Sequence, residues 1–455
     1  MIRIAAASTL YGAATVAAAL DAGMFGEDRP GDRTILLVCN NVAVPEITPA
    51  LDEMPGFEAL RPAFDAVVSW NQVIRPYHPS GWSPRADDCV LWERAFRREL
   101  DLGDEPVELL LESIQVNPAR AIAAVFPDAP VEVYADGLMS YGPTRDKLPP
   151  SLHRRIRRLL YLDLAPGLRP LLLSEYQVPA ETVPLDAVRK VLAEVTTASA
   201  AAVAAARPVV EEGAQGPALL LGQYLAALDI LTPQEEEELH VRMVRGAVAA
   251  GHRNVVFKPH PSAPERYSRA LEEAASAAGA TLSVYDQPVL AEVLYETLRP
   301  GLVVGCFSTA LLTAAALYDI PVARVGTELL FERLTPYENS NRIPVVVVDT
   351  LVPDLGDPQA LRRADGGLLL DEAGTVDRLA PLVRAVGYCM RSEAYPHLRE
   401  ETIAWLNTHL PAEKRYFKRR RLTALELPGG LPVRARRLRK NPVVRKVAMT
   451  VRNRF

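Results

Sequence analysis

The stretches VVFKPHPS (Val255–Ser262) and VVGCFST (Val303–Thr309) decide the fold that this sequence predicts. Each begins with a short β-branched run, and continuous apolar runs bounded by Pro or Gly are typical of buried strands in a parallel sheet. The first run leads into Lys258 and His260, and the second leads into a helical pattern. Open α/β sheets bind ligands at the carboxyl ends of their strands, so we expect a ligand site at this edge.

The residue types at this edge indicate a phosphate site. Ser308 and Thr309 stand where the second stretch turns into a helix, and the start of a helix attracts anions. His260 could donate a hydrogen bond to a phosphate oxygen or, when protonated, donate a proton to a leaving phosphate. Lys258 would add a positive charge. A surface-loop histidine, a solvated lysine and hydroxyls that only cap the helix remain the alternatives.

Strand and helix patterns alternate along both halves of the chain. Expected strands of the first half are 2–6, 34–39, 66–69, 107–111 and 131–134. A Pro-punctuated connection at 175–185 and an Ala-rich helix at 186–206 lead to expected strands at 218–221, 254–257, 281–285, 302–304 and 343–348. This alternation predicts an α/β protein with two Rossmann-like domains, whose parallel sheets face a cleft in the GT-B arrangement. The fold alone leaves the function open.

The sequence predicts four segments, of which the last is strongly basic and the rest together are acidic. They are an N-terminal domain (1–178), a C-terminal domain (179–390), a closing helix (391–412) and a basic tail (413–455). Between 414 and 455 there are 15 Lys and Arg against one acid, Glu426. Because cationic clusters alternate with Leu and Val, we expect the tail to contact a membrane surface. RNA binding and a merely disordered tail stay open.

Composition is that of an enzyme-sized globular protein. The chain has 455 residues, of which 49% are hydrophobic and 24% charged. Its four cysteines are scattered without metal-binding spacing, which favours a reduced, cytoplasmic setting. The N-terminal 23 residues fit a strand, turn and helix better than a signal peptide. No run of apolar residues is long enough to span a bilayer.

The run VEVYADGLMSYGP places Asp136 and Gly137 directly after the expected strand 131–134. In a two-domain cleft this edge faces the phosphate site, so the carboxylate could take a proton from an acceptor hydroxyl. An ordinary Asp-Gly turn is the alternative. Further candidates at strand ends are, for the cleft or acceptor, Ser8, Thr9, Asn40 and Asn41 and, for the donor, Gln223. His78 lies in a loop of the first domain that could contact the acceptor.

Together these motifs resemble those of bacterial GT-B sialyltransferases, most of all the polysialyltransferase-like family, over about residues 1–390. That family has an acidic-acidic-Gly motif, a His-Pro motif and a Ser/Thr pair in this order. The matching residues here are Ala135-Asp136-Gly137, His260-Pro261 and Ser308-Thr309. Ala135 departs from the pattern because it replaces the first acid, which puts donor or acceptor preference in doubt.

The resemblance implies an inverting glycosyltransferase that moves sialic acid from CMP-sialic acid to a hydroxyl of a glycan or glycolipid. Asp136 would be the general base, and His260 would bind the donor phosphate as general acid or electrostatic stabiliser. Glu292 would bind the ribose hydroxyls. The other implied donor-binding residues are Lys258, Pro261, Ser308, Thr309 and Gln223.

No metal or other cofactor is expected, since no Asp-x-Asp follows a strand and a nucleoside monophosphate donor needs no cation. The expected setting is cytoplasmic and peripheral at the membrane, with no nucleic-acid partner. Two other functions stay open. One is a GT-B transferase or epimerase for another nucleotide sugar, and the other is a non-catalytic protein that binds a membrane or RNA through its tail.

Overall fold

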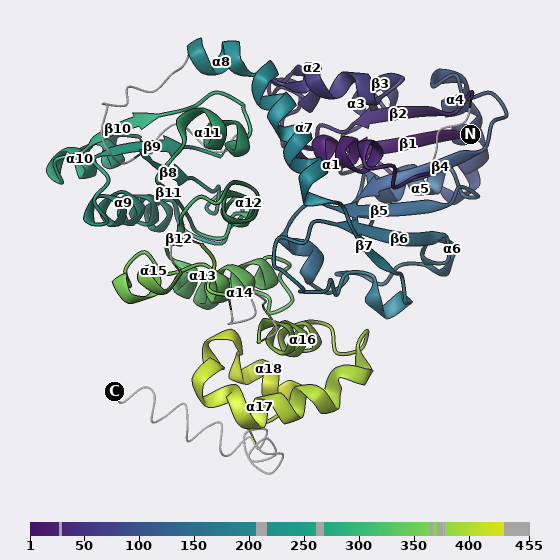
Figure 1. Ribbon diagram of the computed structural model, residues 1–455. Coiled ribbons are helices and arrows are strands. Elements are labelled where there is room, and N and C mark those ends of the chain that lie inside the picture. Colours follow the sequence, from purple (N-terminus) through teal and green to yellow (C-terminus); the bar gives the residue numbers. More distant parts are fainter. Residues whose placement is uncertain are drawn as a thin grey trace.

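The computed structural model describes residues 1–26, 30–205, 216–260, 268–364, 367–370, 376 and 378–431. Two parallel sheets lie side by side in it (Figure 1). Their strand orders are β3-β2-β1-β4-β5-β6-β7 and β10-β9-β8-β11-β12. In each sheet the order turns at the first strand, as in doubly wound Rossmann-like sheets. The predicted pair of Rossmann-like domains in a GT-B arrangement is therefore confirmed.

The first domain contains seven strands joined by helices. The strands are β1 (Ile2–Ala7), β2 (Arg33–Val38), β3 (Ala66–Ser69), β4 (Val107–Glu112), β5 (Val131–Ala135), β6 (Ile156–Tyr161) and β7 (Ala180–Thr182). The helices are α1 (Leu10–Asp21), α2 (Phe57–Leu60), α3 (Trp70–Val73), α4 (Cys89–Glu99), α5 (Ala119–Val125) and α6 (Pro150–His153). Alternate residues of β1 enter two different cores, Ile4 on one face and Ala5 on the other, so helices cover both faces of the sheet.

The second domain repeats the alternation with five strands. They are β8 (Ala218–Leu221), β9 (Asn254–Lys258), β10 (Thr281–Val284), β11 (Leu302–Gly305) and β12 (Val322–Arg324). Its helices are α9 (Pro233–Ala249), α10 (Ser268–Ala277), α11 (Ala291–Leu298), α12 (Thr309–Tyr318) and α13 (Thr327–Arg333). The helix α9 begins with a capping box of Thr232 and Glu235, as the sequence TPQE favours.

Helix α7 (Leu185–Ala198) joins the two domains and is followed by α8 (Ala200–Ala205). One side of α7 packs against α1 and α2, and another packs against α11 and α12 of the second domain (Figure 1). The strand β7 lies within the expected connection 175–185 and forms an edge of the first sheet. The chain therefore crosses between the domains at α7.

The prediction of a strand at 343–348 is wrong. These residues belong to the buried helix α14 (Arg342–Leu351), which begins with a hydrogen bond from Val345 N to Asn341 O. A short, continuous apolar run suits a buried helix as well as a buried strand, so its pattern could not decide between them. The last strand of the second sheet is instead β12, whose three residues were too few to be recognised.

The C-terminal helices pack across both domains. They are α15 (Pro358–Ala364), α16 (Leu379–Met390), α17 (Arg399–Glu413) and α18 (Arg419–Ala424). Helix α16 packs on α14, and the Tyr395 hydroxyl donates a 2.9 Å hydrogen bond to Leu171 O in the first domain. No helix in the described part of the chain combines the length and apolarity that crossing a bilayer requires.

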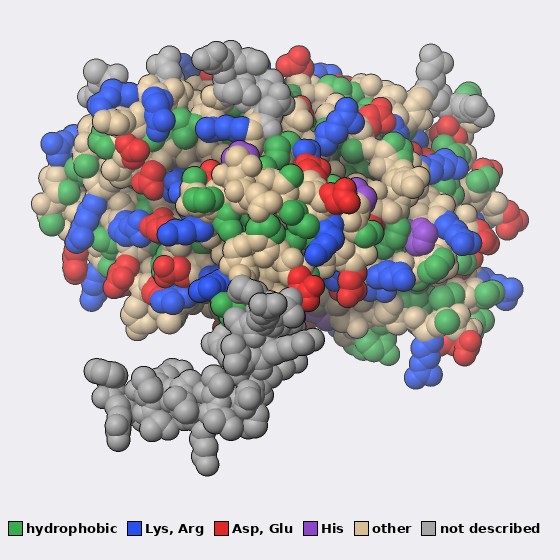
Figure 2. All heavy atoms as spheres, turned by 90° about the horizontal axis from the view of Figure 1, so that it is seen from below, with side chains coloured by type: hydrophobic (Ala, Val, Ile, Leu, Met, Phe, Trp, Pro, Cys, Tyr) green, Lys and Arg blue, Asp and Glu red, His purple; other side chains and the backbone are tan. Residues whose placement is uncertain are grey.

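The first part of the expected basic tail is folded. Tyr416 is buried and its hydroxyl donates a 2.7 Å hydrogen bond to Asp349 Oδ2, while Arg421 pairs with Glu338 at 2.7 Å. Figure 2 shows this face from below, where basic and acidic side chains are interspersed. Residues 414–431 therefore belong to the body of the protein, and 432–455 lie outside the described residues.

Candidate active site

The carboxylate of Asp136 lies directly after β5, close to the first turn of α1. A Cβ added to Gly12 would meet Thr9 Oγ1 at 3.1 Å, the Tyr134 hydroxyl at 3.1 Å and Asp136 Oδ2 at 3.2 Å. The hydroxyl of Thr9 caps α1 by accepting a 2.9 Å hydrogen bond from Gly12 N. A methyl group at position 12 would therefore push on the oxygen atoms of Thr9, Tyr134 and Asp136.

A second acid, Glu112, lies beside Asp136 at the end of β4. Its Oε2 accepts hydrogen bonds from Ser8 N at 2.9 Å and from Ser8 Oγ at 2.7 Å. The predicted cleft residues Ser8 and Thr9 are therefore close to Asp136. Sequence reasoning missed Glu112, although one signal was present. It is a lone acid immediately after the apolar run Leu109–Leu111, at the carboxyl edge of the sheet.

Burial and neighbouring acids raise the pKa of Asp136. The value rises to about 7, first because burial disfavours the charged form and then because Glu112 and Glu292 are negatively charged. Burial also raises the pKa of Glu112, although the hydrogen bonds from Ser8 act to lower it. A carboxylate with a pKa near neutrality accepts a proton from a hydroxyl better than an ordinary aspartate.

The facing edge of the second domain carries Lys258 and His260 at the end of β9. Lys258 is buried and its Nζ donates to Gln287 O at 3.5 Å; burial lowers its pKa to about 8. The His260 ring lies 4.0 Å from that of Tyr224 between centroids. Burial and, secondly, Lys258 lower the pKa of His260 to about 4, so its imidazole is neutral at pH 7.

Ser308 and Thr309 lie at the start of α12, as expected. Ser308 is the N-cap and accepts a 3.3 Å hydrogen bond from Ala310 N. Thr309 Oγ1 accepts a 3.3 Å hydrogen bond from Leu138 N of the first domain. The structure therefore brings the Asp-Gly motif and the Ser-Thr motif into contact across the domain boundary.

Gln223 and Glu292, the other residues expected to bind the donor, lie in the second domain. Gln223 Oε1 accepts a 3.0 Å hydrogen bond from Phe307 N, which joins the loops that follow β8 and β11. Glu292 is buried in α11 and accepts a 2.7 Å hydrogen bond from Thr313 Oγ1. Burial raises the pKa of Glu292, although this hydrogen bond and the positive charge of Lys258 act to lower it. Its carboxylate thus lies between α12 and the end of β9.

Of the remaining candidates, Asn40 and His78 form hydrogen bonds within and beside the loop that follows β2. Asn40 Nδ2 donates to Thr48 O at 2.9 Å, and His78 Nε2 lies 2.9 Å from Val42 O. Asn41 lies next to Asn40, and its buried Oδ1 has no hydrogen-bond partner within the described chain. These contacts stabilise the loop after β2 and show no link to Asp136. Pro261 lies outside the described residues.

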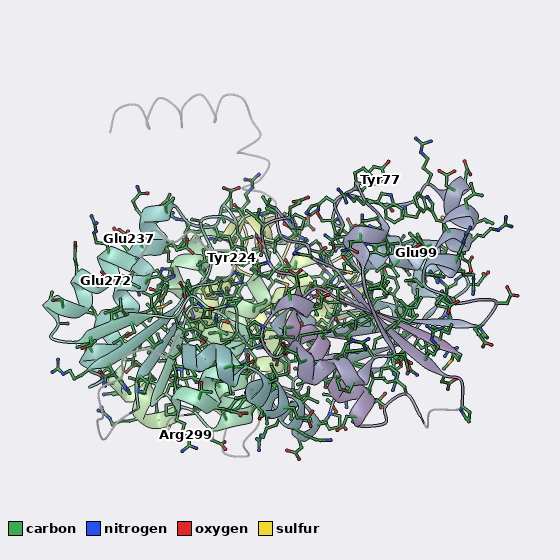
Figure 3. All side chains as sticks on the ribbon, turned by 90° about the horizontal axis from the view of Figure 1, so that it is seen from above. Tyr77, Glu99, Tyr224, Glu237, Glu272 and Arg299 are labelled. Carbon is green, nitrogen blue, oxygen red and sulfur yellow. The ribbon has the colours of Figure 1, made fainter. Side chains whose placement is uncertain are left out.

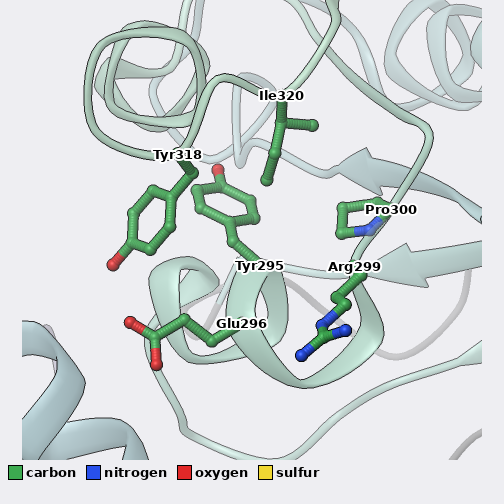
Figure 4. A pocket seen from close by; sticks show the side chains of 6 residues that line it. All are labelled: Tyr295, Glu296, Arg299, Pro300, Tyr318 and Ile320. Atoms are coloured by element: carbon green, nitrogen blue, oxygen red, sulfur yellow. The ribbon is translucent and has the colours of Figure 1, made fainter.

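A pocket of about 390 Å³ lies at the far end of α11. It is lined by Tyr295, Glu296, Arg299, Pro300, Tyr318 and Ile320 (Figure 4). Figure 3 shows Tyr224, the neighbour of His260, near the boundary between the domains and Arg299 at the opposite edge of the second domain. The pocket contains none of the expected site residues, so the candidate active site is the cluster at the carboxyl edges.

The two parallel sheets define a GT-B fold, and the family match shows that the protein is a glycosyltransferase of the sialyltransferase class. The chain belongs to the alpha-2,8-polysialyltransferase family, whose model matches residues 3–327. This confirms the resemblance seen in the sequence. No sequence among the curated proteins matches the chain significantly.

Solved structures with a similar fold are distant in sequence. UDP-GlcNAc 2-epimerase from Methanocaldococcus jannaschii is 12% identical with a TM-score of 0.45, covering 85% of this chain and 99% of that one. The GT-B domain of a sialyltransferase from Photobacterium damselae is 12% identical with a TM-score of 0.40, covering 76% and 96%. A 2,6-sialyltransferase from Photobacterium sp. JT-ISH-224, crystallised with CMP and lactose, is 11% identical with a TM-score of 0.39, covering 76% and 75%.

Proposed function

We propose that this protein is an inverting sialyltransferase that uses CMP-sialic acid and transfers the sugar to a hydroxyl of a glycan or glycolipid. The observation that carries the proposal is the contact between the two motifs. Leu138, two residues after Asp136, donates to Thr309 at the start of α12. This contact supports a site in which Asp136 of one domain faces a phosphate bound at the start of α12 of the other.

In the proposed reaction Asp136 takes the proton of the acceptor hydroxyl. Its raised pKa, about 7, suits this role because the ionised form is available near neutral pH and is still a good proton acceptor. The acceptor oxygen then forms a bond to the anomeric carbon of the sugar as the bond to the CMP phosphate breaks. Attack from the face opposite the leaving phosphate inverts the anomeric carbon.

The donor phosphate would lie among His260, Lys258 and the start of α12. The neutral imidazole of His260 can donate a hydrogen bond to a phosphate oxygen. The negative charge of a bound phosphate would raise the pKa values of both His260 and Lys258, since an opposite charge favours the protonated form. Backbone N–H groups at the start of α12 add further donors to an anion.

A thermal-stability comparison tests the donor. A ligand that binds only the native state raises the unfolding temperature according to its affinity. We expect CMP to stabilise the protein more than UMP or UDP, and we expect His260→Ala to remove most of the CMP effect. Stronger stabilisation by UDP would contradict the proposal and favour a GT-B enzyme for another nucleotide sugar.

Fewer residues of the basic tail are available for a membrane contact than the sequence predicted. Residues 414–431 of the basic segment are folded against the body of the protein, with Arg415 and Arg421 paired to Asp349 and Glu338. We propose that the residues after 431 carry the contact with an anionic membrane surface. Removal of residues 432–455 should abolish binding to vesicles containing anionic lipid and leave transfer to a water-soluble acceptor unchanged.

A further inference from the structure

Glu112, Tyr134 and Asp136 belong to one face of the first sheet. In the parallel pairing of β4 with β5, Glu112 lies opposite Tyr134. Side chains two residues apart along a strand point to the same face, so Asp136 follows Tyr134 on that side. The first turn of α1 covers this face, because Gly12 lies within contact distance of both Tyr134 and Asp136. The carboxylates of Glu112 and Asp136 are thus neighbours beneath the first turn of α1.

The position of Glu112 is specified by the turn before α1. Ser8 donates two hydrogen bonds to the same oxygen, one from its backbone and one from its hydroxyl. Bonds from both groups of one residue hold the carboxylate in a single orientation and favour its charged form. Ala135 packs against the core on the opposite face of the sheet, so on this face the acid beside Asp136 comes from β4.

We propose that Glu112 is a positioning residue for Asp136: held by Ser8, its negative charge makes the Asp136 carboxylate a stronger proton acceptor. This inference rests on the proposed role of Asp136 as the base. Glu112 would touch neither the donor nor the acceptor. It would act through Asp136 alone.

The charges around Asp136 support this role. The acid Glu112 on β4 raises the pKa of Asp136 more than Glu292 on α11 does. Within the described parts of the chain, the hydroxyls of Tyr134 on β5 and Tyr11 on α1 also interact with Asp136, and both have raised pKa values and are neutral near pH 7. Burial is the largest cause of the raised pKa of Asp136, and Glu112 is the charged neighbour that raises it most.

The pH dependence of transfer by Glu112→Gln tests the proposal, since Gln keeps the shape and can still accept from Ser8. Loss of the charge should lower the pKa of Asp136 and move the acidic limb of kcat/KM by about one unit to lower pH. Above this limb kcat should fall about tenfold with an unchanged KM for the donor. Glu112→Asp keeps the charge and should retain the wild-type limb. Glu99→Gln, which removes an exposed acid on α4, should change nothing.

An unshifted limb in Glu112→Gln, with or without loss of activity, would overturn the proposal and leave Glu112 a structural residue. A readout without catalysis separates this outcome from failure of the proposed function. The carboxyl carbon of Asp136 can be titrated by NMR and assigned as the signal that Asp136→Asn lacks. We expect its titration midpoint to fall in Glu112→Gln even if CMP-sialic acid is not the donor. An unchanged midpoint would also reject the proposal.

Discussion

In the first domain the charged groups of the site are acids, Asp136 and Glu112, whereas in the second domain they include Lys258 and His260. Burial acts on both sides but in opposite directions. It raises the pKa of Asp136 to about 7 and lowers those of Lys258 and His260 to about 8 and about 4. Without ligand, each side is thus shifted toward its neutral form.

The two sides respond differently to a bound phosphate. On the second-domain side, a phosphate would reverse much of the shift by adding negative charge beside Lys258 and His260. On the first-domain side, the shift is produced by burial and by the neighbouring acid Glu112, which are present with or without donor. We infer that the second-domain side is completed by its ligand, whereas the first-domain side is set by the fold.

The largest effect is expected for Asp136→Asn. The amide cannot accept the proton, so transfer should fall about 10²–10⁴-fold, the usual contribution of a general base. The donor side is untouched, so stabilisation by CMP should persist. Initial rates with CMP-sialic acid and a thermal scan with CMP measure the two parts. Activity near the wild-type level would reject Asp136 as the general base.

The next effect is expected for His260→Ala. Loss of a hydrogen-bond donor to the phosphate should reduce kcat by about 10²-fold, as for other donors that stabilise a developing charge. Unlike Asp136→Asn, this variant should also lose CMP stabilisation. His397→Ala, which alters an exposed histidine in the C-terminal region, is the control. Equal CMP responses in the two histidine variants would reject the donor role.

Gly12→Ala tests how closely α1 specifies the carboxylate. The new methyl group would lie 3.2 Å from Asp136 Oδ2 and 3.1 Å from the Tyr134 hydroxyl, so one of them must move. We expect kcat/KM to fall by about tenfold to hundredfold, because small misplacements of a catalytic group are costly. Gly81→Ala is the control, since its Cβ would meet only His78 O, at 3.8 Å. Similar kinetics for both variants would show that the turn tolerates the methyl group.

The pH dependence of stability gives a smaller effect with a definite sign. The pKa of Asp136 is raised from 3.8 to about 7 by folding. The stability associated with its protonated form is therefore present below about pH 4 and is lost as pH rises toward 7. The variant Asp136→Asn has no carboxyl group at this position, so it does not lose stability in this way as the pH rises. Thermal unfolding between pH 4 and 8 should show the variant gaining stability relative to wild type with rising pH, and parallel curves would contradict the raised pKa.

The smallest effect is expected for Thr309→Val, which removes the hydrogen bond from Leu138 N across the domain boundary. Loss of one such bond should lower the free energy of unfolding by about 1 kcal/mol. Denaturant unfolding measures the change. Thr408→Val on α17, whose hydroxyl bonds only within its own helix, is the control. A larger loss in Thr408→Val would show that the contact between the domains adds little.

Sequence reasoning succeeded where local patterns carry the information. The strand Ala218–Leu221 was predicted with its observed bounds, and Asp136, His260 and Ser308 were each placed just after a strand. It failed where the same pattern suits two structures. The run at 343–348 is apolar throughout, and only packing against α16 and the first domain makes it a helix.

The sequence by itself determined the two alternating domains, the order of the three motifs and their places at the carboxyl ends of strands. These features follow from apolar runs, turn residues and the parallel direction of the strands. Only the tertiary structure decided that Leu138 contacts Thr309, that Glu112 neighbours Asp136 and that Gly12 lies against both Tyr134 and Asp136. Such contacts join residues far apart in the chain, and their energies depend on distances and burial that no local pattern encodes.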